Sequence, residues 1–534
     1  MIAGNYIINS MWKASAHRDF RIFMSSIRHA RKIQDDYLLD LLKKNKDTVY
    51  GLECGFAGIG SVGQFRERIP IRTYDDYKPW IDRIIAGENG VLTSEPVTLL
   101  EPTGGSSGGL KLIPYTESLR REFLRGINTW VYDLFETYPQ IKNGRSYWSI
   151  SPAVKIPETI KSSIPIGFDE DINYLGSIGK QLRKVMVGDS DLRNVRDMNE
   201  FRFRTAVELL QAKNLAFISI WNPTFLTVLI DYMESNIESL CKNLSETDSD
   251  RAREIDSAFR GESEDKFNRI WPMLSVISCW TDSSAGLHAE NLGAKFPGVT
   301  IQGKGLLATE GFITLPLTES GGRVLSFMSH YFEFVDTNND VHLCDELTDG
   351  QRYRVIITTG GGLYRYDLGD IVEVDEFFDG LPVLTFIGRH KTVDMVGEKL
   401  SEEHVTRMIS DAVMQAGSKC EFAMLSPERT STGGVYVLYV ANDNALNGFA
   451  SQLRDVVEHG LKENIYYRHA RDIGQLGPLK IYVVNSGASE KFIERCVNDG
   501  QKLGDIKPVS LDHRSGWSEW FNGSYLNECN ASAI

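Results

Sequence analysis

A stretch rich in glycine and serine, "TGGSSGGLK" at Thr103–Lys111, has the residue types of a phosphate-binding loop. Ser106 and Ser107 offer hydroxyl groups, the glycines leave main-chain N–H groups accessible, and Lys111 adds a cation. Successive main-chain N–H groups in a turn form a concave nest that binds anions. The spacing departs from the GxxxxGK[ST] pattern of kinase-type loops, because Leu110 stands at the lysine position. The stretch therefore indicates either a pyrophosphate loop of another kind or a flexible turn.

Two further stretches place carboxylates at a strand end or a turn. In "GLLATEGF", Glu310 follows Thr309 at the end of an apolar strand, where one carboxylate together with phosphate oxygens can hold Mg²⁺. "TTGGGLYRYDLGDIVEV" contains Tyr364 and presents Asp370 on a glycine turn, where a carboxylate can accept both hydroxyls of a ribose. Simpler structural explanations exist for both residues: Glu310 can be a solvated residue at a strand end, and Asp370 can be part of an ordinary hairpin turn. A hairpin does not explain the triple glycine, because glycine destabilises a strand.

Basic residues stand in two later loops. "FIGRHKTV" carries Arg389 after a predicted strand, with Lys391 two residues later. "GQKLGDIKPVSL" carries Lys507 in a glycine-flanked loop just before a proline, and Lys502 lies at the start of the same stretch. Each of these side chains, taken alone, is typical of a linker or of a solvated surface.

The hydrophobic pattern predicts a mixed α/β chain. Residues 1 to about 90 have helical periodicity, and a short strand at Val97–Leu100 is expected to lead into the glycine loop and then a helix. "NLAFISIW" and "MLSVISCW" have the character of buried strands that alternate with helices, which favours parallel sheet. Residues 321–386 indicate consecutive strands, an antiparallel or barrel-like part. Because a compact α+β pattern restarts near Gly388, we predict two domains, 1–387 and 388–534.

Composition narrows the class of protein. The 534 residues carry a net charge of −14 and no strong basic block, which disfavours nucleic acid as a partner. The seven cysteines are scattered without a CxxC pair, and the histidines form no HExxH pattern, so zinc and disulfide frameworks are disfavoured. The N-terminus lacks the charged region of a signal peptide, and the longest apolar runs are shorter than a membrane span. We therefore expect a cytoplasmic protein with no membrane partner.

The order of the five stretches resembles the adenylate-forming (ANL) superfamily of acyl-CoA synthetases, adenylation domains and luciferases. Within it, the chain is most similar to the GH3 branch, the acyl-acid amido synthetases. "GRSYWSISP", "SIWNPTFL" and "ISCWTD" resemble bacterial members of that branch. The segments that carry the resemblance are Thr103–Lys111, Leu306–Glu310, Tyr364–Asp370 and Gly388–Ser401.

This resemblance implies an ANL-type fold, with a large N-terminal domain of mixed sheets, helices and a β-barrel part, and a small mobile α+β C-terminal domain. It also implies a reaction in which a carboxylic acid and ATP form an acyl adenylate and pyrophosphate. An amine or amino acid then attacks the adenylate to form an amide. The implied cofactors are ATP and Mg²⁺, and the implied partners are these small molecules.

The resemblance also implies roles for individual residues. Glu310 would be catalytic as a ligand of the metal. Lys507 would be the catalytic lysine near the end of the chain, called here the late lysine, which reaches into the site during adenylation. Lys502 is the competing candidate for the late lysine. Lys391 would lie near the pivot between the domains. Trp221 and Phe225 are candidate walls of the acyl pocket, and plain hydrophobic core explains both residues equally well. The residues expected to bind the nucleotide and its metal are Ser106, Ser107, Gly108, Lys111, Thr281, Asp282, Thr309, Glu310, Tyr364, Asp370 and Arg389.

One position departs from the superfamily pattern. Leu306 stands where many members have an aromatic residue that stacks on adenine. Two alternatives to an amide synthetase stay open. One is an acyl-CoA or carrier-protein ligase that forms a thioester, and the other is a non-catalytic nucleotide-binding protein.

Overall fold

The computed structural model describes most of the chain. The described residues are 2–104, 110–149, 162–167, 179–188, 190–195, 197–261, 265–389, 392–396, 398–416, 420–430, 433–441, 449–501, 503 and 506–526. Five residues named above, Ser106, Ser107, Gly108, Lys391 and Lys502, lie outside these ranges.

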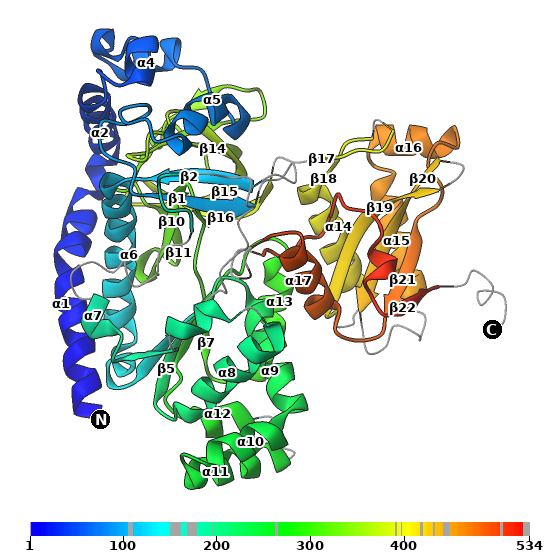
Figure 1. Cartoon of the computed structure of the whole chain (residues 1–534). Coiled ribbons are helices and arrows are strands. Elements are labelled where there is room, and N and C mark those ends of the chain that lie inside the picture. Colours follow the sequence, from blue (N-terminus) through cyan, green and yellow to red (C-terminus); the bar gives the residue numbers. More distant parts are fainter. Residues whose placement is uncertain are drawn as a thin grey trace.

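The N-terminal part begins with helices, as the periodicity predicts. These are α1 (Ile2–Ser26), α2 (Ala30–Lys44), α3 (Val49–Glu53), α4 (Val62–Arg68) and α5 (Tyr74–Ile85). Long helix α1 packs along α6 (Glu117–Thr137), and Figure 1 shows it on the outer left side of the molecule. At the start of α5, the main-chain N–H of Thr73 donates to the Asp76 carboxylate, 2.8 Å away, which completes a capping box.

The glycine- and serine-rich stretch lies between two paired strands. β1 (Leu99–Gly104) and β2 (Leu110–Tyr115) form an antiparallel pair in which Thr103 lies opposite Lys111. The expected order of strand, loop and helix was therefore incomplete, because the apolar "LIPY" segment forms a second strand before the helix. Helix α6 begins only after Thr116, whose hydroxyl caps it by accepting from the N–H of Leu119.

The predicted parallel sheet is confirmed, with strand order β4-β3-β5-β6-β7. Its strands are β3 (Arg145–Trp148), β4 (Met186–Val187), β5 (Leu215–Ser219), β6 (Val276–Cys279) and β7 (Thr300–Gly303). The accompanying helices are α7 (Gly179–Leu182), α8 (Met198–Gln211), α9 (Pro223–Ser235), α10 (Ile237–Ser245), α11 (Ser249–Arg260), α12 (Lys266–Ile270) and α13 (Ala285–Lys295). Helices α9 and α10 follow each other directly and meet at Asn236.

A seven-stranded antiparallel sheet forms the expected second part, in the order β10-β11-β16-β15-β14-β12-β13. The strands are β10 (Thr314–Leu317), β11 (Gly322–Leu325), β12 (Tyr331–Val335), β13 (Val341–His342), β14 (Arg352–Thr358), β15 (Tyr366–Phe378) and β16 (Leu381–Arg389). The short pair β8 (Leu307–Ala308) and β9 (Gly311–Phe312) connects the two sheets along the chain.

The C-terminal segment has its own four-stranded sheet, ordered β19-β20-β21-β22. The four strands are β19 (Phe422–Thr430), β20 (Gly433–Ala441), β21 (Lys480–Val484) and β22 (Gly523–Tyr525). A separate antiparallel pair, β17 (Thr392–Val393) and β18 (Leu400–Ser401), precedes them. Its helices are α14 (Glu402–Gln415), α15 (Ala450–Leu461), α16 (Ile465–Asp472) and α17 (Ala488–Asn498). Figure 1 shows this segment to the right of the earlier elements, with α17 toward them.

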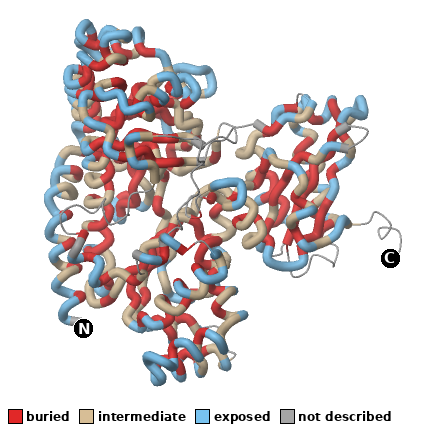
Figure 2. Tube along the Cα trace, in the orientation of Figure 1, coloured by how far each residue is buried: buried red, intermediate tan, exposed pale blue. Residues whose placement is uncertain are grey.

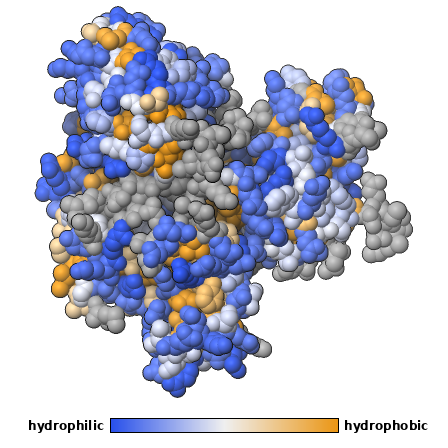
Figure 3. Space-filling view, in the orientation of Figure 1, coloured by the Kyte–Doolittle hydropathy of each residue, from blue (hydrophilic) through white to orange (hydrophobic). Residues whose placement is uncertain are grey.

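Buried apolar contacts hold the C-terminal segment against the parallel-sheet part. One apolar cluster joins residues of the parallel-sheet part, such as Leu226 and Ile277, to Phe422 and Phe492 of the C-terminal segment. Figure 2 shows the buried chain running along the strands of both parts. The visible face is mostly hydrophilic in Figure 3. Within the described part of the chain, no helix has both the length and the apolar character needed to cross a membrane.

Candidate active site

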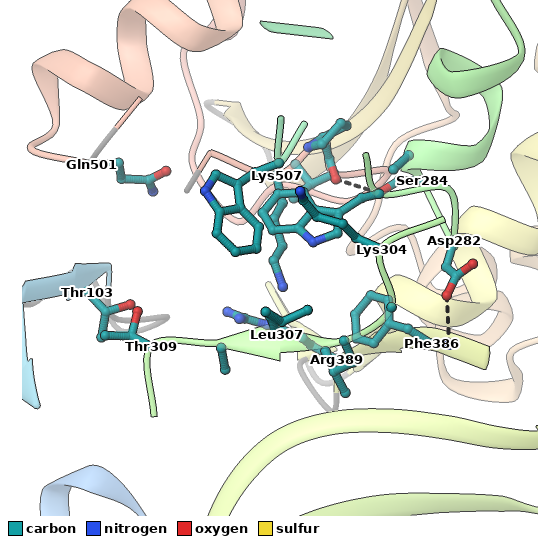
Figure 4. A pocket seen from close by; sticks show the side chains of 18 of the residues that line it. Thr103, Asp282, Ser284, Lys304, Leu307, Thr309, Phe386, Arg389, Gln501 and Lys507 are labelled. Carbon is teal, nitrogen blue, oxygen red and sulfur yellow. Dashed lines mark hydrogen bonds between the residues drawn. The ribbon is translucent and has the colours of Figure 1, made fainter. Parts of the chain in front are cut away.

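A cavity of about 510 Å³ lies where the two N-terminal sheets meet the C-terminal segment. The carboxyl ends of β5, β6 and β7 open into it, which is where ligands bind in parallel sheets. In Figure 4, Lys507 and Arg389 extend into the same space, and Thr103 and Thr309 lie on the side opposite Asp282. Of the residues that the sequence singles out, those that line this cavity are Trp221, Thr281, Asp282, Leu306, Thr309, Glu310, Arg389 and Lys507.

Glu310 lies at the tip of the β8–β9 hairpin and is almost buried. The Tyr366 hydroxyl donates to Glu310 Oε1 across 3.2 Å, and the Tyr115 hydroxyl donates to the main-chain oxygen of Thr309 across 2.6 Å. Two tyrosines from other elements therefore fix the Thr309–Glu310 turn at the cavity wall. Tyr366 was not among the predicted site residues, although it stands two positions after Tyr364.

Asp370 and Arg389 lie opposite each other on the neighbouring strands β15 and β16. Arg389 Nε donates to Asp370 Oδ1 across 3.0 Å, and Arg389 reaches the cavity. The Asp370 carboxylate holds the pKa of Arg389 above its ordinary value, against the opposing effect of burial. Asp370 itself is buried, and its Oδ2 has no hydrogen-bond partner among the described residues.

Asp370 is not among the residues that line the cavity, and Tyr364 and Lys111 also lie outside the lining. The Tyr364 side chain is fully buried, stacks on Tyr50 with 5.3 Å between ring centres, and donates to the Leu92 carbonyl across 3.1 Å. Lys111 lies on β2, with its Nζ 5.3 Å from the centre of the Tyr74 ring. Tyr364 is thus part of the hydrophobic core.

Thr281 and Asp282 follow β6 of the parallel sheet, and Asp282 contacts two residues of the antiparallel sheet. Arg323 lies 2.8 Å from Asp282 Oδ1, and the N–H of Phe386 donates to Asp282 Oδ2 across 3.2 Å. Burial raises the pKa of Asp282, and the positive charge of Arg323 counteracts this effect. Leu306 is buried nearby, and its N–H donates to Thr314 Oγ1 across 2.7 Å.

Lys507 comes to the cavity from the C-terminal segment. Its Nζ lies 4.9 Å from the centre of the Trp280 ring and 5.3 Å from that of Phe386. On either side of it in sequence, Asn222 Nδ2 donates to the Ile506 carbonyl across 2.6 Å, and Ser284 Oγ donates to the Pro508 carbonyl. The loop is therefore held against the N-terminal part by hydrogen bonds to both neighbours of Lys507.

The sequence reasoning missed a second lysine in the cavity. Lys304 follows β7 and lies among Trp130, Trp148 and Trp221. Trp221 was expected as a wall residue and does line the cavity, whereas Phe225 is buried outside the lining. A signal was present, because tryptophans end three strand-like stretches, "SYW", "ISIW" and "ISCW". Carboxyl ends of neighbouring parallel strands share one sheet edge, so these indoles must gather there.

Comparison with solved structures identifies the class to which this fold belongs. The solved structure of the AtGH3.15 acyl acid amido synthetase in complex with 2,4-DB matches with a TM-score of 0.82 and 20% identity, over 94% of this chain and 95% of that one. A second GH3.15 structure matches with a TM-score of 0.81 and 19% identity, over 95% and 96% of the two chains. The fold is that of acyl-acid amido synthetases, which confirms the predicted fold class.

The sequence matches define the family. The GH3 family N-terminal domain matches residues 20–301, the central domain residues 323–389, and the C-terminal domain residues 403–512. The chain belongs to the GH3 family. The indole-3-acetic acid-amido synthetase GH3.17 of Arabidopsis thaliana is 22% identical, over 90% of each chain. The 4-substituted benzoates-glutamate ligase GH3.12 of the same plant is 23% identical, over 90% of this chain and 92% of its own length. The predicted enzyme class, an acyl-acid amido synthetase, is confirmed.

Proposed function

We propose that the cavity binds ATP and a small carboxylic acid, forms the acyl adenylate, and then transfers the acyl group to an amine or amino acid. One observation carries this proposal. Glu310, Arg389 and Lys507, which belong to three separate segments of the chain, line a single cavity with aromatic walls. A carboxylate, a guanidinium and an ammonium in one partly enclosed site are the groups that a reaction between two anions requires.

In the first half-reaction, a carboxylate oxygen attacks the α-phosphorus of ATP, and the bond to pyrophosphate breaks. Arg389 and Lys507 reduce the repulsion between the two anions and stabilise the charge that accumulates on the phosphate oxygens. Removing one such electrostatic contact typically costs about 10²–10³ in rate. The aromatic walls limit access of water, which would hydrolyse the mixed anhydride.

The site also fits a nucleotide with its metal. Asp370 Oδ2 is buried without a partner among the described residues, and it stands beside Arg389, so we assign it a ribose hydroxyl as donor. Thr281 and Asp282 line the same cavity and are assigned to the adenine side. The loop from Ser106 to Lys111, with Ser107 and Gly108, is assigned to the pyrophosphate.

Glu310, beside Thr309, is the proposed magnesium ligand. The described residues contain no group of three or more His, Cys, Asp or Glu side chains that could hold a metal ion. A single carboxylate suits Mg²⁺ that takes its remaining ligands from phosphate oxygens and water. When bound, the ion would withdraw charge from those phosphate oxygens. Tyr366 keeps the Glu310 carboxylate oriented.

In the second half-reaction, the amine nitrogen attacks the carbonyl carbon of the acyl adenylate. The C–N bond forms, the bond from the acyl carbon to the AMP oxygen breaks, and the amine loses a proton. Lys507 occupies space beside the reacting atoms during the first step, so we propose that the chain after Arg389, the last residue of β16, moves as a domain between the steps. Such motions commonly separate the half-reactions of an enzyme.

Pyrophosphate release tests this function. The purified chain is incubated with ATP, Mg²⁺ and a panel of carboxylic acids, and active acids are then combined with amino acids, amines or CoA for product mass measurement. We expect acid-dependent pyrophosphate release and an amide product. No acid-dependent release over a broad panel would contradict adenylation. A CoA thioester as the sole product would contradict the amide assignment.

A further inference from the structure

A buried histidine contacts the hairpin that carries Glu310. His330 stands immediately before β12 and is fully buried. Its Nε2 accepts from the main-chain N–H of Phe312 across 2.8 Å. Phe312 is the last residue of β9, so this hydrogen bond connects His330 to the β8–β9 hairpin, whose tip is Thr309–Glu310. The reaction proposed above does not use His330, whose side chain lies outside the cavity lining.

The β8–β9 hairpin depends on contacts of this kind because it is very short. Each of its strands has two residues, and the two strands form a separate two-stranded sheet. A lone two-stranded hairpin is marginally stable, and its outward N–H groups need acceptors from other parts of the chain. The Phe312 ring packs on Gly126 of α6, where an added Cβ would lie 2.6 Å from its Cδ1.

The hydrogen bond from Phe312 adds what this apolar packing cannot supply. Apolar contact has no preferred direction, whereas a hydrogen bond weakens steeply when its angle changes. The bond to His330 therefore fixes the orientation of the main chain two residues after Glu310.

A buried carboxylate orients the imidazole. His330 Nδ1 lies 2.9 Å from Oε2 of Glu122, a buried residue of α6. Because a main-chain N–H can only donate, Nε2 is the acceptor, and the imidazole proton is on Nδ1, where it donates to Glu122. The same carboxylate accepts from the N–H of Gly360 across 3.0 Å and from the Tyr37 hydroxyl across 2.7 Å. Donors from three separate segments thus hold Glu122.

Two glycines allow these groups to approach closely. A Cβ on Gly311 would lie 3.1 Å from His330 Nε2, so the glycine lets the ring reach the main chain of the hairpin. A Cβ on Gly360 would lie 2.3 Å from Glu122 Oε1. The glycines of "TEGF" and "TTGGG" therefore serve one chain of hydrogen bonds.

This polar chain has a use beyond stability. Burial of polar groups is costly, and apolar side chains of similar volume would fill the same space without that cost. An apolar side chain in place of His330 could not accept from the N–H of Phe312. Hydrogen bonds that orient a metal-binding group from behind typically change metal affinity 10- to 100-fold. Glu310, the proposed magnesium ligand, stands at the tip of the hairpin that His330 holds.

We propose that His330 is a positioning residue for Glu310: by accepting from the Phe312 N–H, it holds the hairpin so that the carboxylate at the tip faces the metal. Glu122 acts one step further back, by orienting the imidazole. This inference rests on the proposed function, because that function assigns Mg²⁺ to Glu310. A purely structural role, in which the buried chain only stabilises the fold, is the outcome that the experiment separates.

Two substitutions divide the two hydrogen bonds of His330. The shorter amide of His330→Asn reaches the place of Nδ1, so it can donate to Glu122 but leaves the Phe312 N–H without an acceptor. The longer amide of His330→Gln reaches the place of Nε2, so it can accept from Phe312 but loses the bond to Glu122. Each variant loses one buried hydrogen bond, so their thermal midpoints should fall by similar amounts.

The metal requirement distinguishes the two variants. We expect His330→Asn to raise the Mg²⁺ concentration for half-maximal pyrophosphate release about 10-fold. His330→Gln should stay close to the wild-type value. Calorimetric titration with Mg²⁺ and ATP, without any acid, should show the same order, with affinity about 10-fold weaker in His330→Asn.

Tyr467→Phe is the matched control. Tyr467 is buried in the C-terminal segment and donates to Glu458 Oε2 across 2.9 Å, so its substitution also removes one buried hydrogen bond. It should lower the thermal midpoint and leave the Mg²⁺ requirement unchanged. The inference is wrong if the Asn and Gln variants of His330 raise this requirement equally, if neither raises it, or if Tyr467→Phe raises it as much.

Two further measurements keep every outcome decisive. If His330→Asn does not fold, an ester analogue at position 312, in which oxygen replaces the N–H of Phe312, removes the same hydrogen bond and keeps every side chain. An unchanged Mg²⁺ requirement in this analogue overturns the inference. If no acid supports pyrophosphate release in the wild-type chain, the proposed function fails, and calorimetry with Mg²⁺ and ATP still decides the inference. If the wild-type chain does not bind Mg²⁺ and ATP, the inference fails too.

Discussion

Asn222 Nδ2 donates a hydrogen bond to the main-chain oxygen of Ile506 across 2.6 Å, immediately before Lys507. Ser284 Oγ donates to the carbonyl of Pro508, immediately after it. Two side chains of the N-terminal part thus hold both carbonyls that flank Lys507. Because hydrogen bonds of this kind can form only while the loop is docked, Asn222 and Ser284 stabilise the arrangement in which Lys507 faces the cavity.

Asn222→Asp separates this docking from folding. Asn222 Oδ1 also caps α9 by accepting from the N–H of Thr224 across 2.9 Å, and aspartate caps equally well. Aspartate has no donor for the Ile506 carbonyl, so one buried hydrogen bond is replaced by repulsion between two oxygens. We expect acid-dependent ATP–pyrophosphate exchange to fall about 10-fold or more. Amide formation from a preformed acyl adenylate should change little.

Ser284→Ala serves as an independent test of the same arrangement. This substitution removes the other hydrogen-bond donor to the loop, so it should also lower the rate of acid-dependent ATP–pyrophosphate exchange. The double variant should lose the effects of both hydrogen bonds together. The docking role is refuted if Asn222→Asp slows both half-reactions to the same extent, or if it slows neither.

Lys507→Met tests the late lysine. The ammonium stabilises charge on the phosphate oxygens during adenylation, so its loss should reduce pyrophosphate exchange about 10²–10³-fold. Conversion of a preformed acyl adenylate to the amide should be largely retained, because Lys507 is proposed to leave the site for that step. Lys502→Met is the matched comparison. If Lys502→Met, and not Lys507→Met, abolishes exchange, the assignment of the late lysine is wrong.

Tyr366→Phe tests how Glu310 is oriented toward the metal. Burial, together with the Glu310 carboxylate, raises the pKa of Tyr366, so its hydroxyl stays protonated and donates. Loss of a hydrogen bond to a metal-binding carboxylate typically weakens metal affinity 10- to 100-fold. We expect the Mg²⁺ concentration for half-maximal pyrophosphate release to rise about 10-fold. Glu310→Gln should raise it further, and removal of Mg²⁺ by chelation should stop release in every variant. If the Mg²⁺ dependence of Tyr366→Phe is unchanged, Tyr366 does not orient the Glu310 carboxylate toward the metal.

The large-scale architecture was predictable because it depends on local patterns. Short apolar runs bounded by helices predict β5 and β6, and the run of strands after Gly321 predicts the antiparallel sheet. Strand β2 was missed because the glycines before it suggested that a helix would follow directly. The motif residues Glu310, Arg389 and Lys507 were predictable from their order along the chain, and the structure brings all three to one cavity.

The ends of strand-like stretches point to Trp148 and Trp221, whereas the approach of Trp130 to Lys304 is a tertiary feature that no sequence pattern reveals. Trp130 comes from α6, and its separation in sequence from the other two indoles follows no period. Tyr364 illustrates the converse difficulty. It stands in the motif beside functional residues, but its side chain packs in the core, and Tyr366 is the one that contacts Glu310. Tyr364 lies before β15 begins, and the left-handed backbone of Arg365, with φ 51°, interrupts the extended chain between the two tyrosines, so a spacing of two does not place them on the same face.

The triple glycine of "TTGGG" has a packing explanation that a stability measurement can test. A Cβ on Gly360 would lie 2.3 Å from Glu122 Oε1 and 2.8 Å from the Ser118 Cβ. The buried Glu122 carboxylate accepts from the N–H of Gly360, with 3.0 Å to Oε2, and from the hydroxyl of Tyr37. It also lies 2.9 Å from His330 Nδ1. Any side chain at position 360 therefore displaces a buried carboxylate from its donors.

Gly360→Ala should lower the free energy of unfolding by about 1–3 kcal/mol, the usual cost of an overpacked site. Urea unfolding followed by circular dichroism measures this loss as a lower midpoint. Gly4→Ala is the matched control, because nothing lies within 4 Å of a Cβ at that position in helix α1. Alanine is favoured over glycine in a helix, so this control should be neutral or slightly stabilising. Equal midpoints for Gly360→Ala and the wild-type chain would show that Glu122 can move at little cost, and the triple glycine would then need another explanation.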